Sequence, residues 1–363
     1  MKSFNQIYSK LRNECKVRKL QRLRFREILK KYVKTILLVA LAFLLLYSFV
    51  VFNSSHVVTQ IPPILLLWVV FAILSFHQMY KNGPKGPDNP YREKTYSELY
   101  KEEIIAKLVN FYDNNLSFSP KGLFPVRTYQ VRTFGTYDRI KSQDLIEGNI
   151  DGKIPVNIAH LTVQLYTEVD SSDSSKELMS YLSSGHGYGP QPGQEVRVVF
   201  NGLYAAVRLA IPRGTFIALH PQGFITPGSK NKLTLDSAEL EKNFECYTND
   251  KMYTMSIFTA EVIECINNHK RELHNNIDIV LTNDYLSIRI HGGGFPIYSK
   301  TRNVIDYETL YTSFSYLDFI CDLSKAISRS IDHYNETHNI KEITQDPMQN
   351  PKTAKSLDKI SFT

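Results

Sequence analysis

Two long apolar runs near the N-terminus dominate the hydropathy pattern of this chain. Residues 35–52 read TILLVALAFLLLYSFVVF, eighteen positions without a charged side chain, and residues 61–80 form a second run with Pro62 and Pro63 in its first turn. At a rise of about 1.5 Å per residue, each run nearly spans a hydrocarbon core of about 30 Å. The uncharged link 53–60 joins them. The pattern therefore predicts a hairpin of two transmembrane helices.

Basic residues are concentrated before the first run. Residues 1–34 hold twelve Lys or Arg against two Glu, a formal charge of +10, whereas the whole chain carries +7 and its remainder therefore −3. By the positive-inside rule this arm lies in the cytosol, and an even number of spans returns the chain to it. We expect the arm to continue as a helix into the first span. It is either a topogenic signal alone or also a surface for anionic headgroups. The residues assigned to that surface are Arg18, Lys19, Arg22, Arg24, Arg26, Lys30 and Lys31.

Beyond the two runs the chain alternates between helical and strand periodicity. Thr95 and Glu98 stand at capping-box spacing before an amphipathic helix predicted over 96–115, and a long final helix is predicted after its cap Asp306. A further helix is predicted over 256–274. Segments rich in β-branched and aromatic residues indicate strands at 126–134, 154–166, 195–211, 215–219, 277–281 and 285–290.

This order of elements predicts an α+β fold. It consists of a two-helix transmembrane hairpin followed by a cytosolic domain of mainly antiparallel sheet with flanking helices. The expected segments are a basic arm 1–34, spans 35–52 and 61–80 joined by the link 53–60, a Pro/Gly linker 81–94, a cytosolic domain 95–336 whose internal boundary, if there is one, falls near 225–232, and a disordered tail 337–363.

Composition narrows the classes of function. The four cysteines are scattered, without a Cys-x-x-Cys pair or a His at zinc spacing, so they are read as reduced structural thiols. The negative charge of the chain after residue 34 does not indicate a nucleic-acid-binding domain. The serine-nucleophile motif Gly-x-Ser-x-Gly does not occur in the sequence, and neither does His-Glu-x-x-His or another metal-type cluster. We therefore expect neither a cofactor nor a metal.

Polar residues around one predicted turn are the first candidates for chemistry. Asp138, Arg139, Asp144 and Glu147 would form an acid–base or ion-binding cluster if they were buried together. Residues of this kind more often cap turns and make a salt bridge. His186 lies in a Gly-rich stretch typical of a flexible binding loop and would act in proton transfer, although such stretches usually only connect elements.

A second stretch, His291-Gly-Gly-Gly-Phe295, is similar to a phosphate-cradling turn. It follows a predicted strand, but it lacks both the Gly-x-Gly-x-x-Gly and the Gly-Lys-Ser/Thr spacing, and no helix opens directly after it. A nucleotide site is therefore not favoured here.

Three stretches resemble the bacterial membrane-protein family known as domain of unknown function 3137 (DUF3137). They are YDRIKSQDLIEGNIDG at 137–152, VVFNGLYAAVRL at 198–209 and FECYTNDKM at 244–252. The likeness covers about residues 95–330. After Asp250 the chain reads Lys-Met-Tyr-Thr where the family pattern has an acidic residue, Ala and Arg. The resemblance implies a membrane-tethered cytosolic domain and no assigned activity. With the charge pattern, it implies a multi-pass protein of the bacterial inner membrane with both termini in the cytosol.

These features favour a membrane-anchored cytosolic binding or adaptor protein of unknown ligand. The alternative is a membrane-bound hydrolase or transferase whose carboxylates at 138–147 converge with His186. More than about 10 Å between Asp144 and His186 would exclude that alternative, because proton transfer needs hydrogen-bond reach directly or through one water. The expected partners are the lipid bilayer, through anionic headgroups at the arm, and an unknown protein. Nucleic acid is not expected, and oligomerisation is left open.

Overall fold

The computed structural model describes residues 3–15, 20–27, 29, 95–125, 137–168, 194–212, 214–223, 231–282, 284–296 and 304–338. The helices are α1 (Phe4–Glu14), α4 (Tyr96–Tyr100), the π-helix η1 (Lys101–Ile105), α5 (Ala106–Tyr112), α7 (Ala238–Asn243), α8 (Lys251–Ile257), α9 (Ala260–Leu273) and α10 (Tyr307–Thr337). The strands are β1 (Leu116–Ser119), β2 (Arg139–Ile150), β3 (Ile154–Glu168), β4 (Gln194–Arg208), β5 (Phe216–Pro221), β6 (Lys232–Leu233), β7 (Phe244–Thr248), β8 (Ile277–Thr282) and β9 (Tyr285–His291).

The strands form one nine-stranded sheet in the order β1-β2-β3-β4-β9-β8-β5-β7-β6. Every neighbouring pair is antiparallel. The hairpin predicted at 277–290 is confirmed, with Thr282 opposite Tyr285 and Asp284 in the left-handed conformation that such a tight turn needs. This hairpin is inserted between β4 and β5, so it joins the two halves of the sheet. The mainly antiparallel sheet that the sequence predicts is therefore present.

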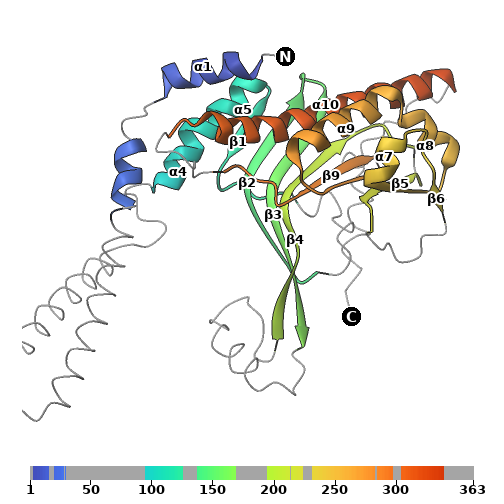
Figure 1. The fold of residues 1–363 in the computed structure, drawn as a ribbon, viewed down its shortest axis with the longest axis horizontal. Coiled ribbons are helices and arrows are strands. Elements are labelled where there is room, and N and C mark those ends of the chain that lie inside the picture. Colours follow the sequence, from blue (N-terminus) through green and yellow to red (C-terminus); the bar gives the residue numbers. More distant parts are fainter. Residues whose placement is uncertain are drawn as a thin grey trace, which may run out of the picture.

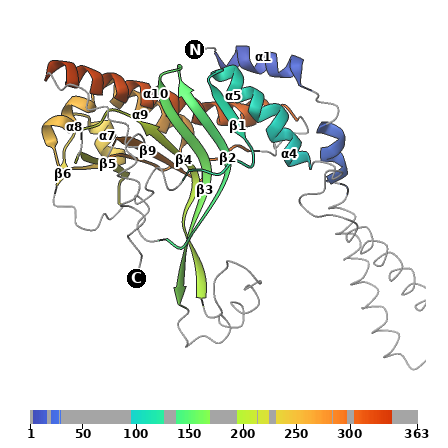
Figure 2. The same cartoon turned by 180° about the vertical axis from the view of Figure 1, so that it is seen from behind.

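The main hydrophobic core lies between one face of the sheet and the helices. Alternate residues of β8 point to this core, namely Ile277, Ile279 and Leu281, while Asp278 points to the opposite face. Figure 1 shows α10 running along the sheet with α9 beside it, and Figure 2 shows β2, β3 and β4 in front of α10 when the molecule is seen from behind. Each large apolar side chain buried in this core contributes about 1.5–3 kcal/mol.

A smaller core covers the other face of β2, β3 and β4. It contains Phe124, Leu145, Ala159, Leu161, Val163, Phe200, Tyr204 and Ala206. The ring of Phe124, which follows β1 in the chain, meets that of Tyr204 edge-on with centroids 5.1 Å apart. Beyond this core, β3 and β4 continue as a two-stranded ribbon away from the rest of the sheet (Figure 1).

Local capping signals place the helices that begin and end the domain. Thr95 Oγ1 accepts a hydrogen bond from Glu98 N at 3.2 Å, and Thr95 N donates to Glu98 Oε2 at 3.0 Å, so the predicted capping box is confirmed. Asp306 Oδ2 accepts from Thr309 N at 3.1 Å and caps α10 as predicted. The helix predicted over 256–274 is present as α9, but its predicted start is four residues too early. The chain forms α8 and α9 there, and Thr259 caps α9 in an extended conformation.

The N-terminal arm departs from the expected continuous helix. α1 ends at Glu14, and Cys15 adopts an extended conformation, so the helical residues 20–27 form a separate segment. The buried residues Phe4, Ile7 and Leu11 form one face of α1, which packs against α5 and α10. A helix with such a face is stabilised by the core that it covers.

No helix within the described residues is long and apolar enough to cross a membrane. The predicted spans 35–52 and 61–80, with the link 53–60 and the linker 81–94, lie outside those residues. The transmembrane hairpin in the expected fold class is corrected accordingly, and the fold is a large antiparallel sheet with helices. The same finding contradicts the expected multi-pass location in the inner membrane.

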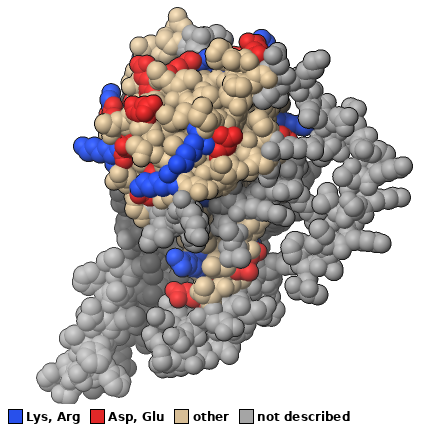
Figure 3. All heavy atoms as spheres, turned by 90° about the vertical axis from the view of Figure 1, so that its right-hand side faces the viewer, with Lys and Arg blue, Asp and Glu red and all other residues tan. Residues whose placement is uncertain are grey.

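Acidic and basic side chains are interspersed over the face that Figure 3 shows. Lys and Arg lie next to Asp and Glu among the described residues of that face, and neither sign forms a continuous area. Ion pairs such as Arg271 with Glu239 and Lys232 with Glu245 likewise bring the two signs together at the surface.

Candidate functional site

A cleft of about 300 Å³ opens between the sheet, the turn after β9 and helix α10. It is lined by Lys101, Gln143, Asp144, His160, Gly292, Gly293, Gly294, Phe295, Pro296, Thr312 and Tyr316. The cleft thus brings together two stretches that the sequence analysis treated separately, namely Asp144 and the glycines after His291. It also adds Lys101 and His160, which that analysis did not select.

The polar floor of the cleft is a buried ion pair. Lys101 Nζ lies 2.7 Å from Asp144 Oδ1 and 2.8 Å from Oδ2, and the two side chains are only 10% and 4% exposed. Lys101 begins the π-helix η1, whose wider turn is a local irregularity of a kind found frequently at functional sites. Burial raises the pKa of Asp144, while the hydrogen bond and the charge of Lys101 oppose this effect.

The backbone at Asp144 is strained in a way that turns its side chain toward Lys101. The register of β2 against β3 shifts between Gln143 and Ile146, which marks a β-bulge. At this bulge Asp144 has a φ of 60°, the left-handed region that non-glycine residues rarely adopt. Its amide donates to Pro120 O at 3.2 Å. Such conformations persist where the surroundings enforce them, and they cluster at functional sites.

His160 and the glycine turn line the cleft beside the ion pair. His160 lies across from Gln143 in the β2–β3 register, which places it beside Asp144. Burial lowers the pKa of His160, so the ring is neutral at pH 7. A Cβ at Gly294 would lie 3.3 Å from His160 Cδ2, so a side chain there would enter the cleft. Gly292, with a φ of 69°, turns the chain back after β9.

The other predicted site residues lie outside this cleft. Asp138 is exposed, and its Oδ2 accepts a hydrogen bond from Tyr166 N at 2.6 Å. Arg139 is opposite Gln164 in the sheet, and the exposed Glu147 is opposite Asn157. Strand alternation and the bulge therefore separate the four residues.

Asp144 alone of the four lines the cleft. His186 lies outside the described residues, so its distance from Asp144 is not part of this geometry.

The basic residues predicted to meet headgroups are only partly described. Arg22, Arg24 and Arg26 lie on the helical segment 20–27. Arg18, Lys19, Lys30 and Lys31 lie outside the described residues. Their contact with anionic headgroups stays a prediction.

A second polar cluster is centred on Asp278, a residue with no exposed surface. His220 Nδ1 lies 2.9 Å from Asp278 Oδ1, His291 Nε2 lies 2.6 Å from Oδ2, and Arg289 Nε lies 3.4 Å from Oδ2. Burial alone would raise the pKa of Asp278, but the hydrogen bonds from both histidines and the charge of Arg289 outweigh it and hold that pKa well below its usual range. The cluster ties β5, β8 and β9 together on the face away from the helices.

Comparison with known proteins bears on this region. The model of the family described as "Protein of unknown function (DUF3137)" matches residues 200–329. The resemblance to DUF3137 is confirmed. The matched region is narrower than the 95–330 predicted from the sequence, and it contains the whole Asp278 cluster and the glycines of the cleft. Lys101, Asp144 and His160 lie before the DUF3137 match.

Two further comparisons add no function to the DUF3137 resemblance. No curated protein sequence matches the chain. Among solved structures, the crystal structure of the mycobacterial trehalose monomycolate transport factor A, TtfA, aligns with 9% identity over 58% of this chain and 90% of that chain, at a TM-score of 0.28. Structural similarity this low supports no argument about the fold or the function of this chain.

Proposed function

We propose that this chain is a non-enzymatic binding or adaptor protein, that residues 95–336 act as one binding unit, and that the cleft at Lys101 and Asp144 takes a small polar ligand. The observation that carries the proposal is the buried ion pair at the floor of the cleft, held by a strained backbone at Asp144. A buried pair of charges is weak as a source of stability, because desolvation offsets its attraction. Backbone strain and buried charge in one cleft are therefore better explained by ligand binding than by stability.

The chemistry of the lining favours a ligand that is neutral overall. The charges of Lys101 and Asp144 cancel, and the His160 ring is neutral. The site offers both donors and acceptors to hydroxyl, amide or zwitterionic groups, and the side chains of Phe295 and Tyr316 add apolar area. Among the described lining residues, the charge of Lys101 is compensated by Asp144, so the site does not favour a strongly charged phosphate. A volume of about 300 Å³ is at the low end of small-molecule sites, which span about 300–1,000 Å³.

The hydrolase or transferase alternative has less support. It required several carboxylates of 138–147 to converge, and only Asp144 reaches the cleft, where it is paired with Lys101. A general base must lie within hydrogen-bond reach of the proton that it removes, and Asp138 and Glu147 are exposed on other parts of the sheet.

A thermal-shift screen of the purified full chain tests the binding proposal. The panel contains polyols and sugars, amino acids, nucleotides and inorganic phosphate. A ligand at a hundredfold excess over its Kd stabilises the folded state by about 2.7 kcal/mol. We expect a shift with a neutral or zwitterionic class, confirmed by calorimetric titration with one ligand per chain.

Two variants make the screen specific to the cleft. Gly294→Leu places a side chain against His160 and leaves both residues of the ion pair in place. Gly294 does not have a left-handed conformation, so a leucine fits the backbone there. His333→Ala, at an exposed position of α10, serves as the control. Loss of the shift in Gly294→Leu alone supports the proposal. No response of the wild type to the neutral and zwitterionic classes, or an equal response in Gly294→Leu, contradicts it.

A further inference from the structure

Three side chains with metal-binding atoms meet in the seam between α9 and α10. His269 comes from α9, and Asp318 and Asp322 come from α10, one turn apart and therefore on one face of that helix. One ligand atom from each residue lies within 4.8 Å of the other two. The seam is distinct from the cleft of Lys101 and Asp144, and none of the three residues lines that cleft.

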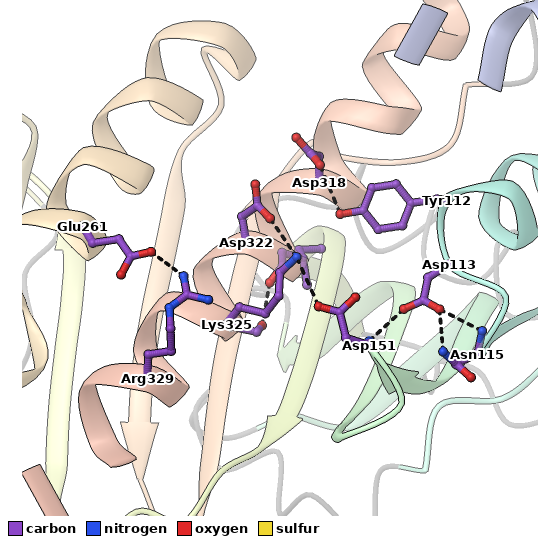
Figure 4. A network of polar contacts seen from close by, with 11 residues as sticks. Tyr112, Asp113, Asn115, Asp151, Glu261, Asp318, Asp322, Lys325 and Arg329 are labelled. Carbon is purple, nitrogen blue, oxygen red and sulfur yellow. Dashed lines mark hydrogen bonds and ion pairs between the residues drawn. The ribbon is translucent and has the colours of Figure 1, made fainter. Parts of the chain in front are cut away.

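The two carboxylates are already oriented by neighbouring groups. Tyr112 Oη donates a hydrogen bond to Asp318 Oδ1 at 3.1 Å. Lys325 Nζ lies 3.1 Å from Asp322 Oδ1 and 3.7 Å from Asp151 Oδ2. Figure 4 shows Tyr112 pointing at Asp318 from α5, and Lys325 between Asp322 and Asp151. Outer contacts of this kind hold the ligands of metal sites in place.

The ring of His269 gives an independent sign that a partner belongs in the seam. Its side chain is 12% exposed, and Nδ1 is buried without a hydrogen-bond partner among the described residues, the nearest carboxylate oxygen being Glu272 Oε2 at 4.0 Å. A buried nitrogen without a partner is unfavourable, because it has lost its hydrogen bond to water and gained none in the protein.

We propose that His269, Asp318 and Asp322 bind one divalent transition-metal ion. One imidazole nitrogen with two carboxylate oxygens suits zinc, manganese or iron(II), whereas calcium and magnesium prefer oxygen ligands alone. At metal–ligand distances of about 2.0–2.2 Å in a tetrahedral site, ligand atoms lie about 3.4 Å apart. The three atoms therefore need to approach one another by at most about 1.4 Å (4.8 Å less 3.4 Å).

The charges of the seam are compatible with a bound cation. Asp318 and Asp322 together carry two negative charges when ionised, and Lys325 compensates one of them. Lys325 can keep its contact with Asp151 while an oxygen of Asp322 binds the ion, because Asp151 Oδ2 already lies within 3.7 Å of Nζ. A metal ion would also link α9 to α10 at the middle of the helical layer.

Equilibrium dialysis of the chelator-treated full chain against Zn²⁺ or Co²⁺ tests the site. We expect one saturable ion per chain, and with Co²⁺ a visible absorption spectrum of a four- or five-coordinate site. His269→Ala and Asp322→Asn should each weaken binding at least tenfold, by loss of a ligand. His333→Ala and Asp236→Asn, both at exposed positions, should bind as the wild type does.

A circular-dichroism melt of each variant separates loss of a ligand from loss of the fold. If His269→Ala does not fold, His269→Gln keeps most of the side-chain volume and replaces it in the comparison. Absence of saturable one-to-one binding in the wild type overturns the proposal. Equal affinity in a folded His269 variant and in His333→Ala overturns it as well.

Discussion

Replacing Lys101 by Met removes the cation that faces Asp144 and keeps most of the side-chain volume. The pair is separated by 2.7 Å, and its side chains are 10% and 4% exposed, so little water reaches the carboxylate to replace the ammonium group. Breaking a buried ion pair by removing one partner costs about 3–5 kcal/mol. At about 2–4 °C per kcal/mol for a domain of this size, we expect Lys101→Met to melt roughly 6–20 °C below the wild type at pH 7.

This loss should depend on pH in one direction. Burial raises the pKa of Asp144 even with Lys101 present, and removal of the cation raises it further. A carboxyl group whose folded pKa exceeds its unfolded value of about 3.9 binds more protons in the folded state. Its effect therefore lowers stability as pH rises from near 4 through the folded pKa. The deficit of Lys101→Met should be largest at neutral pH and should shrink on acidification.

Urea denaturation of a double-mutant cycle measures both effects. Asp144→Asn is the partner variant, since Asn also tolerates the left-handed conformation at this position. The double variant should regain most of the loss, because no unpaired charge remains buried. Lys121→Met is the control, with a side chain 80% exposed, and should change stability by less than about 0.5 kcal/mol. A Lys101→Met loss below about 1 kcal/mol, or an equal loss at pH 5 and pH 7, would refute the reasoning.

Three further substitutions test other parts of the fold. The histidine and arginine partners of Asp278 lower its pKa against the effect of burial, so the ionised carboxylate stabilises the fold above its unfolded pKa of about 3.9. This contribution is lost as pH falls below about 4. Asp278→Asn should therefore lose less stability on acidification than the wild type in melts between pH 3 and 7, and an equal loss would contradict the assignment. Gly202→Ala places a Cβ 2.1 Å from Ile290 O and should cost about 1–3 kcal/mol or more in urea titrations by pushing β4 away from β9, so a neutral result would speak against the close strand contact. His274→Gly relieves a φ of 54° at the end of α9 and should raise stability by about 0.5–1 kcal/mol in a thermal melt, whereas a loss would show that the His side chain contributes there.

Local signals in the sequence predicted much of the fold correctly. The Thr95 capping box, the Asp306 cap and the hairpin around residue 284 each depend on neighbours within a few positions, so a pattern in the chain is enough to find them. The π-turn at Lys101–Ile105 and the break at Cys15 have no such signal, because packing of distant residues decides them. The membrane part of the expected fold class came from hydropathy alone and is corrected by the described helices.

The candidate site was only partly accessible from the sequence. Asp144 was selected, but with neighbours in sequence that β-strand alternation turns elsewhere. Its contacts in the fold are Lys101, which lies 43 positions earlier, and His160, which the β2–β3 register places beside it. A strand was predicted at 154–166 but none at 139–150, so the register that places His160 beside Asp144 could not be derived from the sequence. The ligands of the proposed metal site lie at His269, Asp318 and Asp322 on two helices, at a separation that no short motif covers.

The docking of α1 has a consequence for how the protein is made. Tyr8 Oη donates to Ile305 O across 297 positions, Tyr307 Oη donates to Asn5 Oδ1 across 302, and the Phe4 ring packs on Tyr307 and Phe314. Helix α1 therefore meets the α10 part of its binding surface only after about 300 further residues have been synthesised. During that interval part of its apolar face is exposed to solvent, so a chaperone that covers this face would favour a high yield of native protein.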